Sequence, residues 1–233
     1  MNEFKNLYDK HWRNYSLSKD VSSDHSPNEI LESIEPLLKK GNRLLDVGCG
    51  DGVITRIAVD RYQEIHGCDI SDTALHRSRC IGIFPVCSDL NDGHIPYKDA
   101  TFDCVTALEV LEHIINPLRI LIEIKRVLEA NGQFLLTTPN IRYFRNLQTL
   151  IFRGSFPHTT TDTFIWGGGH FHYFTRRDLS LLLTQAGFKR INFYINERQF
   201  SRSWKRRFIR RIIGKFQFGE YFCGGITLEA IKE

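Results

Sequence analysis

From about residue 28 to residue 196, the chain alternates between short apolar runs and longer stretches in which apolar residues recur every three or four positions. Short apolar runs are typical of buried strands, and the longer period is typical of amphipathic helices. The alternation predicts an α/β fold with a doubly wound, mostly parallel sheet. We expect strands at 43–47, 64–69, 83–87, 102–108, 133–138, 191–195 and 225–232. We expect helices at 29–39, 53–61, 72–79, 117–129 and 177–186.

The whole chain, residues 1–233, has the length of one such domain with modest additions. Residues 1–40 are expected to supply helices that cover a bound ligand. Residues 141–175 hold aromatic residues, histidines and a glycine run with little periodicity, so we interpret them as a lid rather than a variable surface insertion. Residues 197–222 are expected to form a basic amphipathic insertion between the last two strands.

A glycine loop follows the first predicted strand, with Asp46 at the strand end and then Gly48, Gly50 and Gly52. Ligands of open α/β sheets bind at the carboxyl ends of the strands, and glycines let backbone N–H groups approach them closely. The third glycine comes one residue too early for the dinucleotide pattern G-x-G-x-x-G. Asp46 and Asp51 also flank the loop, which disfavours a pyrophosphate and favours a ligand that carries positive charge.

Two further acids end the next two predicted strands. Asp69 lies 69 − 46 = 23 residues after Asp46, close to the spacing at which an acid binds both ribose hydroxyls. Asp89 ends the third strand, where a short acid can read an adenine amino group. Each acid alone is typical of a turn or a helix N-cap. Three acids at the ends of successive strands are harder to explain in that way, and they indicate a nucleoside-containing ligand.

These segments resemble the ordered motifs of class I S-adenosylmethionine-dependent methyltransferases, in the small-molecule branch that is similar to ubiquinone-biosynthesis O-methyltransferases. The resemblance covers roughly residues 28–196 and the last strand. The motifs that carry it are Leu-Asp-Val-Gly-Cys-Gly-Asp-Gly, Gly-Cys-Asp-Ile-Ser, Cys-Ser-Asp-Leu, Phe-Asp-Cys-Val-Thr-Ala-Leu-Glu-Val-Leu-Glu-His-Ile and Thr-Pro-Asn.

The resemblance implies a Rossmann-like, three-layered fold with seven strands, of which the last is antiparallel. It also implies S-adenosylmethionine as cofactor and S-adenosylhomocysteine as product. In such a site the glycine loop holds the methionine end, Asp69 the ribose, and Asp89 with Leu90 the adenine. The cofactor-binding residues expected here are Asp46, Gly48, Cys49, Gly50, Asp69, Ile70, Asp89, Leu90 and Glu109.

Three histidines are candidates for removing a proton from the methyl acceptor or for positioning it. His113 follows the fourth predicted strand, and His170 and His172 precede the helix predicted at 177–186. An oxygen or nitrogen acceptor must lose a proton, and a nearby histidine can take it. Each histidine can instead position the acceptor or make an ordinary structural hydrogen bond.

A divalent metal ion is a less favoured alternative at the same place. If the turn after the fourth strand is helical, Glu109, Glu112 and His113 share one face at positions i, i+3 and i+4. Such a set resembles the metal-binding stretch of ubiquinone-biosynthesis O-methyltransferases, although the same sequence motif, Glu-x-x-Glu-His, occurs in relatives without a known metal. Tyr8 and Trp12 could cover the cofactor from the N-terminal segment, or merely pack there.

The net charge of +4 is unevenly placed, because residues 198–215 contain Arg and Lys but no Asp or Glu. Aromatic and aliphatic residues recur every fourth position from Phe200 to Phe216. This pattern predicts a cationic amphipathic helix that either lies on an anionic membrane or packs on the domain. The N-terminus has no apolar leader, and no apolar run approaches the ~20 residues of a membrane span. The cysteines are scattered, which favours reduced thiols. We therefore expect a cytoplasmic protein that is at most peripheral to the membrane.

The function predicted from these features is methyl transfer to a small molecule, with a hydroxyl oxygen favoured and a lipid-linked acceptor as a further hypothesis. An RNA methyltransferase is the rival enzyme, which the basic helix would support. Against it, the sequence has no Asn/Asp-Pro-Pro-Tyr motif for methylation of amino groups, no pair of catalytic cysteines and no appended RNA-binding domain. DNA is not expected as a partner. A binding module without catalysis, and a nicotinamide-dependent reductase, are weaker alternatives.

Overall fold

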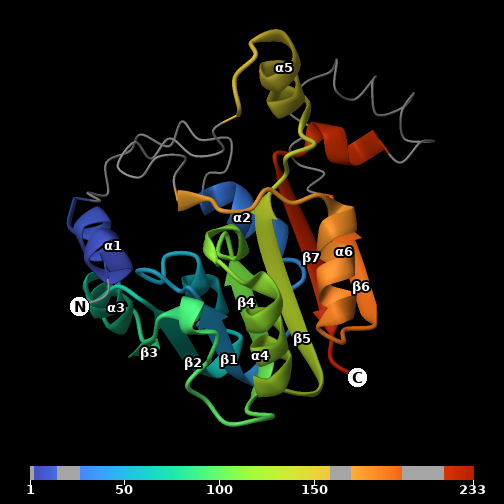
Figure 1. Cartoon of the computed structure of the whole chain (residues 1–233). Coiled ribbons are helices and arrows are strands. Elements are labelled where there is room, and N and C mark those ends of the chain that lie inside the picture. The colour runs from blue at the N-terminus through green and yellow to red at the C-terminus, as the bar shows by residue number, and fades with distance from the viewer. Residues whose placement is uncertain (1–2, 15–26, 158–168, 196–217) are drawn as a thin grey trace.

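The computed structural model describes residues 3–14, 27–157, 169–195 and 218–233, which are arranged around a seven-stranded sheet (Figure 1). Its strands are β1 Gly41–Val47, β2 Tyr62–Asp69, β3 Phe84–Cys87, β4 Phe102–Leu108, β5 Leu128–Pro139, β6 Arg190–Tyr194 and β7 Gly225–Ile231. The order across the sheet is β3-β2-β1-β4-β5-β7-β6. β7 runs antiparallel to β5 and β6, whereas β1 to β5 pair in parallel. The predicted Rossmann-like fold is therefore confirmed.

Helices cover both faces of the sheet. The α-helices are α1 Glu3–Asn14, α2 Pro27–Ile34, α3 Asp72–Arg79, α4 Pro117–Val127, α5 Phe144–Phe152 and α6 Arg176–Gln185. Single 3-10 turns are η1 Thr55–Ala58, η2 Leu90–Asp92, η3 Leu111–His113 and η5 Phe218–Phe222. None of the helices in the described ranges is long and apolar enough to cross a bilayer.

Two apolar cores follow from the alternation of side chains along each strand. Leu45 on β1 packs into the core that α4 and α6 close, in front of the sheet in Figure 1. Its neighbour Leu44 points to the opposite face and packs in the core that Ile30 and Ile34 of α2 close. Successive side chains of a strand point to opposite faces, so a parallel sheet covered on both sides needs continuous apolar runs. This is why the central strands could be located from the sequence.

The two helices that follow the candidate histidines, α4 and α6, both begin at a side-chain cap. Thr175 and Asp178 form a reciprocal capping box at α6, and Asn116 caps α4 just before Pro117. Such caps satisfy backbone N–H groups that have no partner within the helix. The loops that precede α4 and α6 carry the candidate histidines, so these caps fix the ends of both loops.

The predicted helix at 53–61 is wrong, because the structure has only the 3-10 turn η1 and further turns there. Residues 53–59 contain several β-branched side chains, which lose rotamer freedom in a helix. The helix predicted at 29–39 also ends early, at Ile34, since Pro36 follows. Within residues 141–175 the structure has a helix, α5, that periodicity did not reveal.

The corner after β5 is held by one buried side chain, Asn140. Its Nδ2 donates to the carbonyl oxygens of Glu220 (2.7 Å) and Cys223 (2.9 Å), and its Oδ1 accepts from the backbone N–H of Arg142 (2.9 Å). Arg142 also forms an ion pair with Glu220. The amide of Asn140 therefore joins the root of α5 to η5.

Replacing Asn140 by Ala should lower the free energy of unfolding by about 2–4 kcal/mol, because it leaves two buried carbonyl groups and one N–H without this partner. Urea unfolding of the purified protein measures the change. Asn146→Ala is the matched control, since it removes one bond, from Nδ2 to the carbonyl oxygen of Asn140. Equal losses in the two variants would contradict the role given to the corner.

Candidate functional site

The candidate cofactor site lies at the carboxyl ends of β1, β2 and β4. The chain passes from β1 outward to β2 and β3, and then returns to the other side of β1 as β4. At such a reversal, the loops after adjacent strands turn to opposite faces and leave a crevice between them. The predicted glycine loop and the residues after β4 both lie at this edge (Figure 1).

The glycine loop after β1 is built from left-handed backbone. Gly48, Gly50 and Gly52 have φ angles of 73°, 52° and 79°, a region that residues with a Cβ rarely adopt. The N–H groups of Gly48 and Cys49 donate to the carbonyl oxygen of Cys68 at 2.7 and 3.1 Å, which ties the loop to β2. A Cβ at Gly48 would collide with Val110, in the turn after β4. Glycine is therefore required both for the conformation and for contact across the crevice.

The carboxylate of Asp46 is buried under this loop. It accepts hydrogen bonds from the hydroxyl groups of Thr106 on β4 (2.6 Å) and Thr55 on η1. Burial raises its pKa to about 6, although both hydroxyl groups oppose the rise, and the charge of Asp69 adds to it. A buried acid beside a second acid favours a ligand with positive charge, which would stabilise the ionised form.

Asp69, at the end of β2, links the loop to the next turn. Its two carboxylate oxygens accept from the N–H of Gly50 (3.0 Å) and the N–H of Ser71 (2.9 Å). Burial raises the pKa of Asp69, while these bonds act against the rise. The next residue, Ile70, is half-buried and offers its carbonyl oxygen to Lys5 of α1 at 3.1 Å.

Asp89, Leu90 and Glu109 complete the predicted cofactor set. Asp89 caps η2 by accepting from the N–H of Asn91 at 3.0 Å, and the side chain of Leu90 is buried in the core. Glu109 has a left-handed backbone, with φ 57°, and donates its N–H to the carbonyl oxygen of Thr137 on β5 at 3.0 Å. All three lie at strand ends along the same edge of the sheet.

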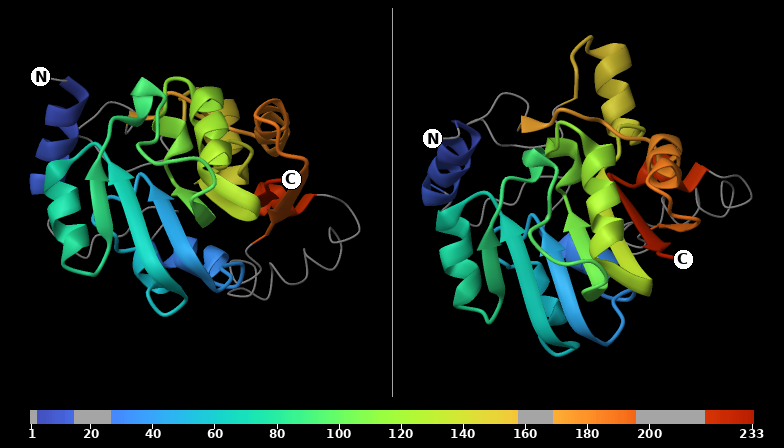
Figure 2. Two further views of the ribbon diagram at one scale, coloured as in Figure 1. Left: turned by 90° about the horizontal axis from the view of Figure 1, so that it is seen from below. Right: turned by 60° about the horizontal axis from the view of Figure 1, so that its bottom comes forward.

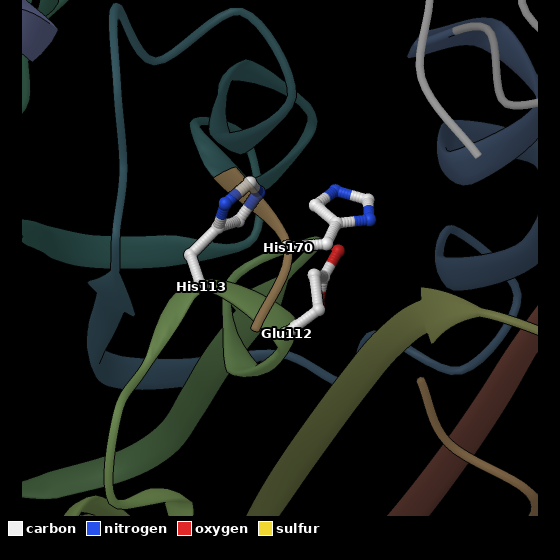
Figure 3. A group of neighbouring side chains, drawn as sticks. All are labelled: Glu112, His113 and His170. Carbon is white, nitrogen blue, oxygen red and sulfur yellow. The ribbon is translucent and has the colours of Figure 1, made fainter. Parts of the chain in front are cut away.

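A second group of side chains, Glu112, His113 and His170, converges next to the turn after β4 (Figure 3). Glu112 and His113 come from η3, and His170 comes from the segment before α6; each brings one ligand-type atom within 4.8 Å of the other two. The imidazole rings of His113 and His170 lie 4.5 Å apart, edge to face. The structure thus brings two of the three predicted histidines together.

We call Glu112, His113 and His170 the acceptor-side group, after the role predicted for the two histidines. Glu112 is its buried member. Its carboxylate accepts from the hydroxyl of Thr138 at 2.9 Å, while its backbone carbonyl accepts from the N–H groups of Phe171 and His172. Burial raises the pKa of Glu112 well above its usual value, and the charge of Glu109 adds to the rise. Burial therefore favours the neutral form of this carboxyl unless a cation replaces its proton.

His113 and His172 have different surroundings. Nδ1 of His113 lies 3.2 Å from the carbonyl oxygen of Gly169, so the tautomer that donates there carries its lone pair on Nε2. His172 lies outside the group: its Nε2 is 3.3 Å from the carbonyl oxygen of Ile115, and its ring stacks on Phe174. These contacts suit a residue that fixes the segment before α6.

The metal set considered from the sequence, Glu109 with Glu112 and His113, required a helical turn that begins at Glu109. The turn η3 begins at Leu111 instead, and Glu109 precedes it with a left-handed backbone. Among the described residues, the three that could share an ion are Glu112, His113 and His170. This group contains His170, and it does not contain Glu109.

Three aromatic side chains of α1, Phe4, Tyr8 and Trp12, form a stripe along the helix. They contact the glycine loop and the segments that carry His113 and His170. The ring of Trp12 approaches Gly50 so closely that an added Cβ would lie 2.7 Å from it. The ring of Tyr8 stands edge-on to His113, with centroids 6.5 Å apart, and Phe4 contacts Phe171 in the same way at 6.2 Å. The four-residue spacing of the stripe is visible in the sequence, where only Tyr8 and Trp12 were singled out.

Polar contacts that sequence reasoning missed hold α1 in this position. Lys5 donates to the carboxylate of Asp72 at 2.6 Å, and Asp9 accepts from the hydroxyl of Ser71 at 2.6 Å. Arg77 of α3 donates to the carbonyl oxygen of Trp12 at 3.0 Å. Figure 2 shows α1 beside α3 in both views. Long-range pairs of this kind leave no signal in a local sequence pattern.

Solved structures share this architecture along most of the chain. A possible histamine N-methyltransferase from Thermotoga maritima has a TM-score of 0.67 at 16% identity, covering 99% of this chain and 98% of that one. Phosphoethanolamine N-methyltransferase 2 from Haemonchus contortus, solved with S-adenosylhomocysteine, has a TM-score of 0.63 at 16% identity, covering 100% of this chain and 61% of that one. At these identities the likeness shows the fold.

A family model described as a methyltransferase domain matches residues 15–192, and the chain belongs to this family. The predicted class of S-adenosylmethionine-dependent methyltransferases is thereby confirmed. A ubiquinone biosynthesis O-methyltransferase from Vibrio cholerae is 26% identical over 161 residues, which are 65% of this chain and 63% of that protein. An uncharacterised protein from Methanocaldococcus jannaschii is 33% identical over 147 residues, or 60% and 62% of the two chains. The chain thus spans less than two thirds of these curated relatives.

The raised pKa of Asp46 predicts a pH-dependent effect of Asp46→Asn on the protein without cofactor. The pKa of Asp46 rises on folding from 3.8 to about 6. The folded wild type therefore loses stability as pH rises through this range, because the buried carboxyl must become ionised. Asn carries no such penalty, so the variant should gain stability relative to the wild type as pH rises from about 4 to about 6, by roughly 1–3 kcal/mol, and the gain should then stay constant. Urea unfolding at several pH values measures it; a difference that does not change with pH would contradict the burial of a charge.

Proposed function

We propose that the protein binds S-adenosylmethionine at the loop after β1 and transfers the methyl group to a hydroxyl oxygen of a small molecule. The observation that carries the proposal is the contact between the two halves of the site. Val110 touches Gly48 of the cofactor loop, and Glu112 and His113 follow Val110 directly. A methyl group bound next to the loop would therefore face the acceptor-side group.

In this proposal the buried acids bind the cofactor through charge and hydrogen bonding. Asp46 and the amides of Gly48, Cys49 and Gly50 surround the methionine end, where the ammonium and sulfonium offset the buried carboxylates. Asp69 accepts from the ribose hydroxyl groups together with Ile70. Asp89 and Leu90 hold the adenine, and Glu109 borders the methionine end from β4.

The chemistry proposed on the acceptor side is alignment and proton removal. The acceptor oxygen attacks the methyl carbon, the bond from that carbon to sulfur breaks, and S-adenosylhomocysteine leaves as a neutral thioether. The hydroxyl proton passes to Nε2 of His113, with His170 beside it to orient the acceptor. Holding the reacting atoms about 3–3.5 Å apart supplies much of the rate.

The choice of oxygen is supported by the relation to a ubiquinone biosynthesis O-methyltransferase, whereas solved structures of similar fold include N-methyltransferases. The wall formed by Phe4, Tyr8 and Phe171 suits an acceptor with an apolar or aromatic body. We therefore extend the proposal to a membrane-partitioned acceptor. The basic segment 200–216, a candidate for membrane contact, lies outside the described residues.

The affinity for S-adenosylmethionine should fall as pH decreases, because a proton on Asp46 must leave before a cationic ligand binds. With a pKa of about 6, Asp46 is ionised at pH 7 and protonated at pH 5. The association constant should drop by up to roughly tenfold between these values. Titration calorimetry measures it, with Asp46→Asn as control, which should bind weakly at every pH. Equal affinity of the wild type at both pH values would contradict the contact.

Removing the proposed base should separate catalysis from binding. His113→Asn should lower the rate of methyl transfer by roughly 10²- to 10⁴-fold, the usual contribution of a general base, while cofactor affinity stays unchanged. His172→Asn, a histidine outside the group, should cost less. A radioactive methyl-transfer assay against phenolic acceptors measures both.

The same assay with a chelator tests the alternative in which Glu112, His113 and His170 hold a divalent ion. A base that acts without metal predicts equal rates with and without chelator. Loss of activity that added Mg²⁺ restores would assign the group to a metal instead.

A further inference from the structure

Helix α5 combines two properties that soluble helices rarely have together. None of its residues is buried, and it carries large apolar side chains. Ile151 is 68% exposed and Phe152 is 79% exposed, and Phe144 and Leu150 are about half exposed, at 50% and 46%. In Figure 1 and in the right view of Figure 2, α5 stands away from the sheet. A helix of nine residues normally depends on burying an apolar face, which the described part of the chain does not provide here.

The charge around this apolar surface is of one sign. Residues 141–157 contain three arginines and neither Asp nor Glu. Arg142 is paired with Glu220 at the root of the helix. Arg145 and Arg153 are exposed, near the two ends of the helix. An amphipathic element with aromatic and aliphatic side chains, flanked by arginines, matches the interface of an anionic bilayer.

The segment after α5 connects this exposed surface to the acceptor-side group. The chain after α5 returns toward the acceptor-side group: the ring of Phe156 contacts Tyr173 at 4.6 Å, and Tyr173 lies 6.1 Å from His170. Contact of α5 with a membrane would therefore bring the acceptor-side group close to the lipid headgroups. A protruding convex element fits a deformable lipid surface better than a rigid protein groove.

We propose that α5, through Leu150, Ile151 and Phe152 with Arg145 and Arg153, is a docking element for anionic lipid bilayers. It gives membrane-partitioned acceptors access to the site, and this role rests on the proposed function. Lipid binding itself depends only on the composition and exposure of α5. The proposal is independent of the basic segment that follows β6.

Co-sedimentation with phosphatidylcholine vesicles, with and without phosphatidylglycerol, tests the inference on the full chain. The wild type should bind the phosphatidylglycerol vesicles, and added salt should weaken binding. The double variant Ile151→Ser/Phe152→Ser should lose at least about tenfold in partition coefficient, because two exposed apolar side chains no longer enter the interface. Arg145→Glu/Arg153→Glu should lose the preference for phosphatidylglycerol.

The matched control is Ile122→Ser/Leu181→Ser, which removes side chains that are 49% and 56% exposed on α4 and α6. It should bind vesicles as the wild type does. Vesicle binding by Ile151→Ser/Phe152→Ser equal to that of the wild type would overturn the proposal. So would a dimer of the wild type, seen by light scattering without lipid, that becomes a monomer in this variant, since α5 would then be a contact between copies.

Calorimetry with S-adenosylmethionine on the same proteins keeps the two proposals apart. All variants should bind the cofactor like the wild type, because α5 lies outside the cofactor site. Absence of vesicle binding together with normal cofactor binding would refute the membrane element alone. Absence of cofactor binding in the wild type would refute the proposed function, whatever the vesicles show.

Discussion

The burial of the Asp46 carboxylate is the constraint on which the candidate site depends. Its two threonine partners come from β4 and from the turn after the glycine loop, so one side chain joins three elements at the reversal of strand order. Burial and the nearby Asp69 make the ionised form unfavourable in the absence of a cation. A positively charged ligand beside Asp46 would offset this electrostatic cost.

The acceptor side is organised differently, by aromatic rings and backbone carbonyl groups rather than by charge. His113 is oriented by the carbonyl oxygen of Gly169 and lies between the rings of Tyr8 and His170. Glu112, beneath them, holds the segment before α6 through its own carbonyl group. Charge on one side and aromatic rings on the other agree with the proposed cationic donor and the proposed apolar acceptor.

Much of the fold could be predicted because the central strands β1, β4, β5 and β7 are largely buried and therefore form mostly apolar runs in the sequence. The prediction failed at 53–61, where several β-branched residues disfavour a regular helix. It also missed α5, whose apolar residues recur at helical spacing over nine residues only. The acids at the strand ends could be located from their spacing. The meeting of Glu112 with His170 could not, because it depends on how a distant segment returns over the sheet.

The conformation of Glu109 is another feature that the local sequence did not predict. The letters Glu-Val-Leu-Glu-His suggest one helical face, yet the backbone at Glu109 is left-handed and the turn starts two residues later. The local sequence does not encode this, because the hydrogen bond from Glu109 to Thr137 of β5 sets it.

Helix α1 touches the cofactor loop through Trp12 and the acceptor-side group through Tyr8. If the proposed donor and acceptor both bind better when α1 is in this position, each strengthens the binding of the other, and the effect is reciprocal. Any molecule that favours the docked position of α1 from one side strengthens binding on the other side by the same factor. The N-terminal helix is therefore a place where donor and acceptor affinities can be coupled without direct contact between the two molecules.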